Sequence, residues 1–413
     1  MAKRHLIGIG GVGMSALATA LVKLGDEVTG ADRTLGTPNV KFLESLGVRV
    51  FPDDGSGVDE ATDEVIVSTA IEETNQGLLR AKELGIPVTH RAKALARTLS
   101  GYKLVAVVGT CGKSTVTAML GHVLAECGLD PMCVNGANVP GWEGAVRFGR
   151  GEYAVAEVDE SDKSLVAFSP YAAIVTNASA DHYSKEEMDE VFDAFVKNVP
   201  GPVIDGRKSG KVEKWKGGKV EDEVSTSIPG RHNRQNAALA LRMAVALGCD
   251  EAKARAALLT FRGVERRLQK IGEGVYDDYA HNPEKLHAML TTLQEKYDRG
   301  GVCVIWRPHG YAPLRKMKDA LAAMFAATLR PQDGLILLPV YDAGGTTDRS
   351  INSIDLMEAL RGRCATPNVF LISDLELAEG FCRHWLHKFD CFVTCGARDP
   401  GLPRLAQKIA DLV

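Results

Sequence analysis

The sequence predicts an α/β protein of three unequal domains, each built around a mainly parallel β-sheet. Short apolar runs alternate with helical patterns along the chain, which is typical of βαβ units. Two glycine-rich loops, at residues 8–13 and 109–115, each follow a predicted strand and precede a predicted helix. The 413 residues are enough for two or three domains, and the pattern divides naturally into three.

We place the domains at residues 1–98, 99–262 and 263–413. The first is predicted to contain, in order, strand 5–9, helix 15–24, strand 27–30, helix 40–46 and strand 64–68. The second is predicted to contain strand 104–108, a helix that ends at Cys127, strands 153–158 and 172–176, and a helix that begins after Arg231. The third is predicted to contain strands 302–306, 334–339, 369–373 and 391–394, with helices between them. Residues 201–227 are rich in glycine and lysine, so we expect a loop or a small polar hairpin there.

The composition is that of an ordinary globular protein, with 45% hydrophobic and 25% charged residues. A net charge of −4 gives no reason to expect nucleic acid as a partner. No apolar stretch approaches the length of a membrane span, and glycines interrupt the apolar run near the N-terminus, which favours a first strand over a signal peptide. The nine cysteines form no CxxC pair, and we expect Cys391 and Cys395 to be core thiols. This cysteine usage favours a reducing compartment, so we expect a cytoplasmic protein.

The first glycine loop has the pattern G-x-G-x-x-G from Gly8 to Gly13. Asp32 follows the second strand at the distance expected for an acid that binds a ribose. The pattern predicts a pyrophosphate site in which Gly10, Gly11 and Gly13 take part, and NAD, FAD or a nucleotide sugar would each present that group. The alternative is that the glycines only allow close packing of the helix on the strand.

The second loop, GTCGKST at residues 109–115, forms a strand, a glycine turn and a helix start, which together predict a phosphate site. Lys113 can reach a β- or γ-phosphate, and the Ser114 hydroxyl can bind Mg²⁺. The pattern is not a full Walker A motif, because Val107 stands at the outer glycine position. The alternative is an ordinary strand–turn–helix corner with an exposed lysine. The residues assigned to ATP in this loop are Gly109, Thr110, Gly112, Lys113, Ser114 and Thr115.

An acidic turn follows the strand predicted at 153–158. Parallel strands present ligand groups at their carboxyl ends, so Glu157 is a candidate for holding the Mg²⁺ of a nucleotide. His182, after the next predicted strand, is a further candidate for Mg²⁺ or phosphate. The candidates for substrate binding in this turn are Asp159, Glu160, Ser161 and Asp162. The alternatives are a solvated acidic turn and a structural histidine.

In this order, these segments resemble the Mur ligases, and within that family the ligases that add L-alanine to UDP-N-acetylmuramate. The resemblance covers nearly the whole chain. It includes GIGGVGM, VSTAI, IPVTHRAKALA, GTCGKST, AEVDESD, IVTNASADH, PGRHNRQNAALA, GVERRL, DDYAHNP and RPHGY. It implies an N-terminal domain for the UDP group, a central ATPase domain and a C-terminal Rossmann-like lid.

The resemblance also implies roles for the matching residues. Lys113 and Ser114 match the ATP-loop lysine and the Mg²⁺-binding hydroxyl, and Glu157 and His182 match metal ligands. The residues that match the segment that meets the base of ATP are His232, Asn233 and Asn236. The residues that match C-terminal groups closing over the nucleotide and the incoming amino acid are Arg267, Asp278 and His281. The UDP site is matched by the N-terminal glycines with Asp32 and Ser68.

The same residues can support an ATP-dependent ligation. A carboxylate does not react with an amine at pH 7, because its leaving group is poor, but transfer of the γ-phosphate makes an acyl phosphate that an amine can attack. Lys113, the loop amides and bound Mg²⁺ would offset the charge on the transferred phosphoryl group. Closure of the C-terminal domain would exclude water, which hydrolyses acyl phosphates. The residues predicted to take part in catalysis are Lys113, Glu157, His182, Arg267 and His281.

Three departures from the family pattern matter. Cys111 stands where the family usually has histidine, and we expect little effect because the loop acts through its backbone. The segment 201–227 is shorter than in the alanine-adding enzymes. Gly310 and Pro313 stand where the family carries two arginines after its PH motif, and neither residue offers a side-chain donor.

These departures leave the added group open. Arg307 or Arg315 are the neighbouring candidates to replace the missing guanidinium groups. The enzyme would add L-alanine, a different amino acid or a recycled peptide, and a homologue that binds without ligating is the alternative from another class. An NAD-dependent oxidoreductase is a further alternative, but it leaves the second loop and the acidic turn without a role. We expect a monomer or a homodimer.

Overall fold

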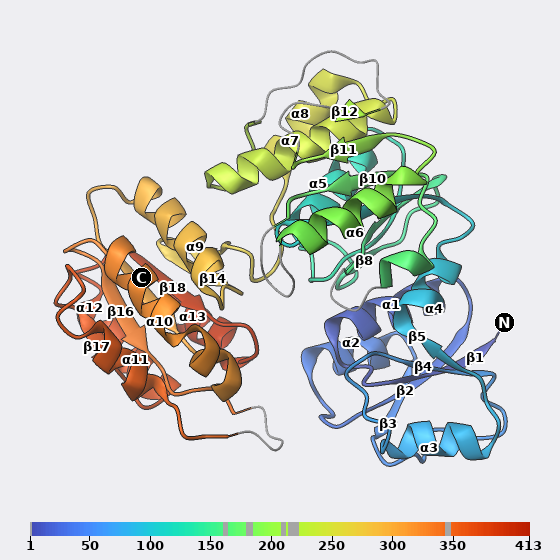
Figure 1. The fold of residues 1–413 in the computed structure, drawn as a ribbon, viewed down its shortest axis with the longest axis horizontal. Helices are drawn as coiled ribbons and strands as arrows, with labels where there is room; N and C mark the ends of the chain where they lie inside the picture. Colours follow the sequence, from blue (N-terminus) through green and yellow to red (C-terminus); the bar gives the residue numbers. More distant parts are fainter. Residues whose placement is uncertain (1, 160–163, 179–184, 208–211, 214–222, 343–347) are drawn as a thin grey trace. The chain divides into compact units, whose positions relative to one another are not determined.

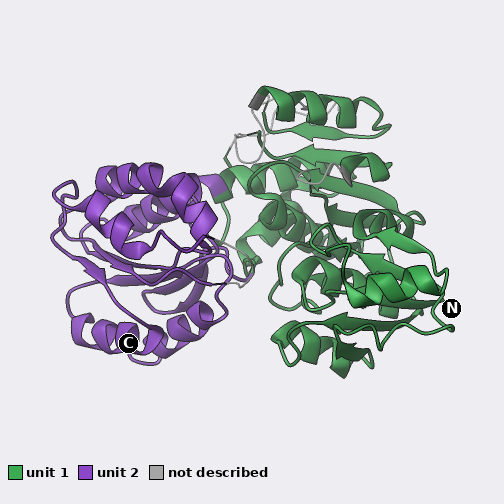
Figure 2. Ribbon diagram, turned by 60° about the horizontal axis from the view of Figure 1, so that its bottom comes forward, with its two compact units in different colours: residues 1–228, 233–264 green, residues 229–232, 265–413 purple. Residues whose placement is uncertain are grey.

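The structure, a computed structural model, contains three mainly parallel sheets with helices packed against them (Figure 1). It describes all residues except 1, 160–163, 179–184, 208–211, 214–222 and 343–347. Contacts divide the chain into two compact units (Figure 2). Unit 1 comprises Met1–Ile228 and Asn233–Val264, and unit 2 comprises Pro229–His232 and Glu265–Val413. The first two sheets belong to unit 1 and the third to unit 2.

The first sheet has five parallel strands in the order β3-β2-β1-β4-β5. The strands are β1 (Lys3–Ile7), β2 (Glu27–Asp32), β3 (Arg49–Pro52), β4 (Glu64–Val67) and β5 (Val88–His90). The helices are α1 (Val12–Lys23), α2 (Pro38–Ser45), α3 (Gln76–Glu83) and α4 (Arg91–Thr98). The chain continues from β1 to β2 on one side and to β4 on the other, so the loop after β1 lies at a switch point, where sheets of this kind bind ligands.

The second sheet has seven strands in the order β12-β11-β10-β6-β9-β7-β8. The strands are β6 (Lys103–Val108), β7 (Met132–Val134), β8 (Val146–Arg147), β9 (Tyr153–Glu157), β10 (Ala172–Val175), β11 (Val203–Asp205) and β12 (Val212–Glu213). The helices are α5 (Lys113–Glu126), a 3₁₀ turn (Ser164–Ala167), α6 (Lys185–Lys197), α7 (Arg231–Ala246) and α8 (Glu251–Thr260). β6 is central and parallel to β10 and β9, whereas the edge strands β8 and β12 are antiparallel.

A shared hydrophobic core joins these two sheets within unit 1. Leu17 of α1 and Leu95 of α4 belong to the same buried cluster as Val108 of β6 and Phe168 of the second sheet's connections. Burying apolar surface from both sheets in one cluster makes each part of the core depend on the other. The two sheets therefore form one compact unit.

The third sheet, in unit 2, has the order β13-β14-β18-β15-β16-β17, and only β13 is antiparallel to its neighbour. The strands are β13 (Gln269–Gly272), β14 (Val275–Asp278), β15 (Val302–Trp306), β16 (Gly334–Leu337), β17 (Val369–Leu371) and β18 (Cys391–Cys395). The helices are α9 (Pro283–Lys296), α10 (Tyr311–Thr328), α11 (Ser353–Leu360), α12 (Leu375–Trp385) and α13 (Gly401–Ala410). Leu286, Phe325 and Leu356 belong to the core on one face, and Cys382 and Leu405 belong to the core on the other.

The helices begin in two different ways. Capping side chains begin several helices, for example Thr37 at α2, Asn75 at α3 and Asn282 at α9. Among the described residues, α1, α5 and α10 begin instead at glycine and have no side-chain cap. Because no side chain caps these three helices, their first N–H groups are available to an anion.

Most predicted elements are present, with shifted ends. β1 ends at Ile7 because Gly8 adopts a positive φ of 73°, which turns the chain. Six strands of two to four residues were not predicted, namely β3, β5, β7, β8, β13 and β14. In the segment 201–227, β11 and β12 do form a hairpin, but β11 is buried rather than polar.

Two further predictions concern the whole chain. In the part of the chain that the structure describes, no helix has the length and apolar character needed to cross a membrane. All nine cysteines are free thiols. Cys391 and Cys395 have no exposed surface, which confirms the prediction of core thiols.

Candidate active site

The loop after β6 is held by two side chains that follow the neighbouring strand β10. Asn177 Oδ1 accepts hydrogen bonds from Thr110 Oγ1 at 2.6 Å and from the Cys111 backbone N–H at 2.9 Å. The Cys111 carbonyl accepts from Asn177 Nδ2 at 3.0 Å and from Thr176 Oγ1 at 2.6 Å. The loop is therefore fixed by contacts to its backbone, which explains why a cysteine can stand at position 111.

Two glycines of this loop are required by close contacts. Gly109 has φ 130°, and a Cβ there would stand 2.1 Å from Thr176 Oγ1. Gly112 has φ 84°, and a Cβ there would stand 2.7 Å from Asn236 Oδ1. The loop therefore needs glycine at both positions, and Asn236 of α7 lies directly against it.

The first turn of α5 carries the other predicted groups. The Lys113 ammonium donates to the Gly109 carbonyl at 2.6 Å, so this side chain folds over the loop. Ser114 and Thr115 follow it and are buried. A cation and a helix N-terminus at one glycine turn suit a polyphosphate.

Glu157 ends β9, with Val107 of β6 opposite it. Its Oε2 accepts a hydrogen bond from the Gly136 backbone N–H at 2.8 Å. A carboxylate and the Ser114 hydroxyl are oxygen donors of the kind that Mg²⁺ prefers, so this donor set fits the ion. Within the described residues, no group of three or more His, Cys, Asp and Glu could hold a metal by itself.

Four predicted residues lie outside the described residues, namely Glu160, Ser161, Asp162 and His182. Asp159 is described and is half-buried. It follows Val158, whose N–H donates to the Val107 carbonyl at 3.0 Å. The acidic turn therefore starts beside the strand that leads into the phosphate loop.

The three polar residues predicted to meet the base of ATP lie at the start of α7. Asn233 and Asn236 are buried, and their contacts assign them to unit 1, whereas His232 is assigned to unit 2. The structure brings Asn236 to the phosphate loop. A role of His232 and Asn233 at the base stays a prediction.

In the first sheet, Asp32 shapes the glycine loop. Its Oδ2 accepts from the Gly10 N–H at 2.8 Å, and its Oδ1 accepts from the Thr34 N–H at 2.9 Å. Asn39 Nδ2 donates to the Gly10 carbonyl at 2.9 Å. The carboxylate keeps further lone pairs for a ribose hydroxyl. Ser68 follows β4, so it and Asp32 stand on the two strands that flank β1.

Arg91 is a candidate that the sequence analysis missed. A Cβ added at Gly13 would stand 3.2 Å from Arg91 Nη1. The guanidinium therefore lies against the first turn of α1, beside the predicted pyrophosphate loop. Its only mention in the sequence was within the segment IPVTHRAKALA, and no spacing linked it to the loop.

Two adjacent arginines of unit 2 have different environments. Arg266 pairs with the fully buried Asp277 at 2.9 Å and donates to the Gly396 carbonyl at 2.6 Å. Its φ of 57° is left-handed, a costly backbone conformation for a residue with a side chain. Arg267 makes no hydrogen bond or ion pair within the described part of the chain, and its guanidinium stands 5.1 Å from the centre of the Tyr279 ring. Arg266 therefore anchors the loop, whereas Arg267 stands on the same loop without such contacts.

Asp278 ends β14, and its carboxylate accepts from the N–H groups of Leu268 at 2.5 Å and Ala280 at 2.6 Å. Burial raises the pKa of Asp278 to about 6, against the opposing effects of Arg267 and of these backbone donors. The carboxylate thus fixes the same loop that presents Arg267.

His281 contacts a second histidine, His309, which the sequence analysis did not select although the segment RPHGY contains it. The ring centroids are 4.8 Å apart with an interplanar angle of 70°. His281 Nδ1 donates to the Tyr279 carbonyl at 2.9 Å. Burial, together with the charges of His281, Arg398 and Lys285, lowers the pKa of His309 to about 4. His309 is therefore neutral at pH 7.

The two arginines expected to replace the family's missing guanidinium groups already have partners. Arg307 pairs with Asp399 at 2.6 Å and donates to the Pro339 carbonyl at 3.0 Å. Arg315 pairs with Asp348 at 2.7 Å. Neither side chain is available without breaking these contacts.

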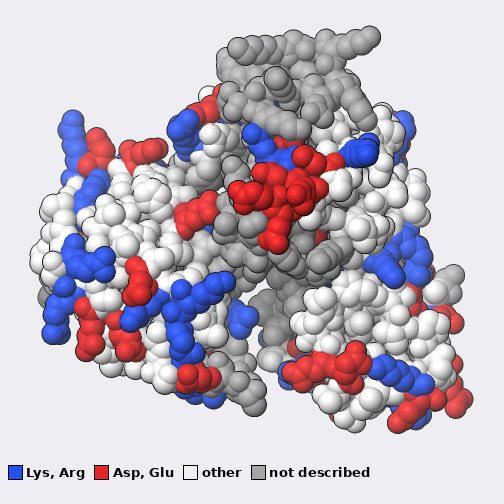
Figure 3. Space-filling view, viewed as in Figure 1, with Lys and Arg blue, Asp and Glu red and all other residues white. Residues whose placement is uncertain are grey.

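Charge is mixed over the visible surface. Figure 3 shows acidic side chains gathered in one area, where α6 lies in Figure 1, while Lys and Arg elsewhere are interspersed with Asp and Glu. The acidic residues of α6 are Glu186, Glu187, Asp189, Glu190 and Asp193. The described residues on this face form no continuous basic surface of the kind that binds nucleic acid.

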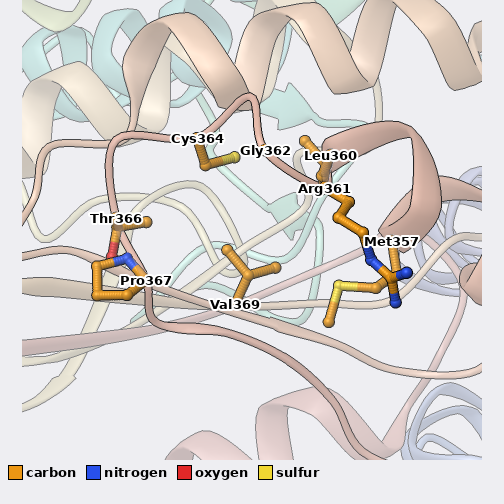
Figure 4. A pocket seen from close by; sticks show the side chains of 8 residues that line it. All are labelled: Met357, Leu360, Arg361, Gly362, Cys364, Thr366, Pro367 and Val369. Carbon is orange, nitrogen blue, oxygen red and sulfur yellow. The ribbon is translucent and has the colours of Figure 1, made fainter.

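A hollow of about 360 Å³ lies between the end of α11 and the start of β17 (Figure 4). Its lining residues are Met357, Leu360, Arg361, Gly362, Cys364, Thr366, Pro367 and Val369. Because it adjoins the amino end of β17, it is at the opposite edge of the sheet from Asp278 and His309. None of the predicted site residues line it.

Comparison with known families gives matches in both units. Residues 3–103 match the catalytic domain of the Mur ligase family, and residues 266–398 match the Mur ligase glutamate ligase domain. The chain is 33% identical to the UDP-N-acetylmuramate–L-alanine ligase of Rubrobacter xylanophilus over 439 residues, covering 96% of this chain and 97% of the relative.

Solved structures agree with this fold. The UDP-N-acetylmuramate–alanine ligase of Thermotoga maritima matches with a TM-score of 0.81 at 24% identity, covering 100% of this chain and 99% of that one. A murein peptide ligase from Psychrobacter arcticus matches with a TM-score of 0.67 at 20% identity, covering all of both chains. Both likenesses concern the fold alone.

Proposed function

Since this chain belongs to the Mur ligase family of ATP-dependent ligases of peptidoglycan precursor synthesis, we propose that it joins L-alanine to the carboxylate of UDP-N-acetylmuramate. The observation that carries the proposal is the pair of uncapped helix starts after β1 and β6, both in unit 1. Two anion sites suit an enzyme that binds a UDP diphosphate and ATP together. The similarity to ligases of this name over almost the whole chain supports the choice of L-alanine. We place the reaction in the cytoplasm.

We assign the UDP diphosphate to the first loop. The backbone N–H groups at the start of α1 and the Arg91 guanidinium supply positive charge there. Asp32 holds the loop through Gly10 and keeps lone pairs for the ribose. Ser68 is assigned to the same site from the other flanking strand.

In the first proposed step, the muramate carboxylate attacks the γ-phosphorus of ATP, ADP leaves, and an acyl phosphate forms. The Lys113 ammonium would exchange the Gly109 carbonyl for phosphate oxygens. Together with the loop N–H groups, it would offset the charge that develops on the transferred group. Thr176 and Asn177 keep the loop in shape for this task.

Ser114 and Glu157 would hold Mg²⁺, with His182 as a third predicted ligand. When bound, the ion supplies positive charge between the carboxylate and the phosphates. The Gly136 N–H fixes the Glu157 carboxylate through Oε2, which keeps Oε1 for the ion.

In the second proposed step, the amine of the amino acid attacks the acyl carbon, an amide forms, and phosphate leaves. Arg267 and His281 are the groups of unit 2 that we assign to the nucleotide and the incoming amino acid. Asp278 positions the loop that carries Arg267. The nucleophilic amine must be unprotonated, and we assign the acceptance of its proton to His281.

A second candidate is the addition of another amino acid or of a peptide. The observation that favours it is the absence of side-chain donors at Gly310 and Pro313, which removes two guanidinium groups from the edge near His309. A larger nucleophile would gain room there.

The test is an ADP-release assay with UDP-N-acetylmuramate, ATP and Mg²⁺. L-alanine, glycine, L-serine, D-glutamate and the tripeptide L-alanyl-γ-D-glutamyl-meso-diaminopimelate are supplied separately, and the product is identified by mass spectrometry. We expect ADP release that depends on L-alanine and a product heavier by one alanine residue. A response to the tripeptide alone would favour the second candidate. No ADP release with any nucleophile would disprove ligation.

A further inference from the structure

Three neighbouring strands of the third sheet end at one edge, and each is followed by a histidine or an arginine at the same distance from its end. β18 lies between β14 and β15 and is parallel to both. The residues that stand three positions after the ends of β14, β18 and β15 are His281, Arg398 and His309. Arg398 therefore follows the strand that lies between the two histidine-bearing strands.

The loops after these strands are bonded together. The Gly396 N–H donates to the Asp278 carbonyl at 3.2 Å, and the Arg307 N–H donates to the Cys395 carbonyl at 3.0 Å. The contact between the rings of His281 and His309 bridges the end of β18. The charge of Arg398 also contributes to lowering the pKa of His309, which places its guanidinium within electrostatic reach of that ring. The three side chains thus form one cluster.

The acids near this cluster already have partners. Asp399 accepts from Arg307 and from the Gly401 N–H at 2.7 Å, and Asp278 accepts from two backbone N–H groups. By contrast, Arg398 is exposed and makes no hydrogen bond or ion pair with any residue that the structure describes. Its positive charge is not balanced by the protein, so the cluster is suited to an anion.

We propose that Arg398 binds the carboxylate of the incoming amino acid and so determines the specificity of the enzyme for a free acid. The inference rests on the proposed function. Arg307 and Arg315 are engaged elsewhere, and Gly310 offers no side chain. Arg267 stands on the loop near Asp278, whereas Arg398 follows the strand between the two histidine-bearing strands. It takes the role that the family's arginines near the PH motif would otherwise supply.

The chemistry of the substrate agrees with this role. A guanidinium binds a carboxylate through two parallel hydrogen bonds, which fixes the orientation of the amino acid as well as its position. Holding the substrate by its carboxylate leaves the amine free to attack the acyl phosphate. A substrate without that negative charge gains nothing from Arg398.

The experiment compares L-alanine with L-alaninamide, which keeps the amine and lacks the carboxylate. In the ADP-release assay, we expect Arg398→Gln to raise the KM for L-alanine about 10- to 100-fold and to leave kcat within about threefold. The kcat/KM for L-alaninamide should not change. Arg398→Lys should restore part of the affinity for L-alanine, because it restores charge but not the two-bond geometry. Arg404→Gln, an exposed arginine on α13, is the control and should behave as the wild type.

A binding measurement keeps this inference separate from the proposed function. L-alanine is titrated into the full-length protein, with ATP analogue and UDP-N-acetylmuramate present, while the imidazole C–H signals of His281 and His309 are followed by NMR. Saturable shifts in the wild type, with an affinity for L-alanine that is at least tenfold lower in Arg398→Gln, support the inference even where turnover fails. Equal affinity of wild type and Arg398→Gln, or equal losses for L-alanine and L-alaninamide, would overturn it while leaving the ligase assignment intact.

Discussion

At the scale of single residues, Lys113 is the most direct test of the phosphate loop. Its ammonium donates to the Gly109 carbonyl of its own loop, and we expect its removal to cost little packing. Lys113→Ala should lower kcat for ADP release at least about 100-fold, because the positive charge that offsets the negative charge of the transferred phosphoryl group is lost. The urea midpoint should stay near that of wild type. Lys253→Ala on α8 is the matched control, and normal turnover of Lys113→Ala would refute the assignment.

Glu157 tests the proposed Mg²⁺ site. Glu157→Gln keeps an oxygen for the Gly136 N–H but removes the negative charge that would bind the ion. The Mg²⁺ concentration for half-maximal ADP release should rise about tenfold or more, since charged oxygens dominate the binding of hard cations. Glu152→Gln, just before the start of the same strand β9, is the control. An unchanged Mg²⁺ titration for Glu157→Gln would count against the metal role.

His309 gives a prediction for pH dependence. Its pKa is about 4 in the folded protein, below the unfolded value of 6.5, so folding favours the neutral ring. The groups that face it are His281, Arg398 and Lys285. Its contribution to stability is present above pH 6.5 and is lost as the pH falls toward 4, by at most about 3 kcal/mol. His309→Gln should therefore lose less stability than wild type between pH 7 and pH 4.5 in urea unfolding. His287→Gln, an exposed histidine on α9, should show the wild-type loss.

At the scale of elements, two neighbouring arginines separate folding from function. Arg266→Ala leaves Asp277 buried without its cation, and we expect a loss of about 3–5 kcal/mol from the stability of unit 2. Arg267→Ala should leave the urea midpoint nearly unchanged and lower the rate of ADP release at least about tenfold. The reverse pattern would show that the roles of the two arginines have been exchanged.

Elements whose structure depends on residues close together in the chain could be predicted from the sequence. The glycine loops, the strands that precede them and the uncapped helices follow from residues adjacent in the chain, so Gly109, Gly112 and Lys113 could be predicted. Arg91, His309 and Arg398 reach their sites only through the order of strands in the sheets, which the spacing of residues does not contain. Short strands such as β3 and β5 have too few residues to show alternation, and their existence depends on pairing with β2 and β4.

At the scale of the whole molecule, the distribution of cores predicts how the protein unfolds. The first two sheets share one buried cluster, whereas the third sheet has its own cores on both faces. Calorimetry should therefore show two cooperative transitions, although the sequence analysis divides the chain into three domains. Arg266→Ala should lower the temperature of one transition only, which identifies unit 2.

The binding of a non-hydrolysable ATP analogue also tests the prediction that the two units unfold separately. The phosphate loop and its clamp, Thr176 and Asn177, all lie in unit 1. An analogue at 100 times its Kd should stabilise that unit by about 2.7 kcal/mol. It should raise the temperature of the transition that Arg266→Ala leaves unchanged. Lys113→Ala should abolish this shift. A third transition, carrying the first sheet alone and insensitive to the analogue, would mean that the shared core is too weak to couple the two sheets.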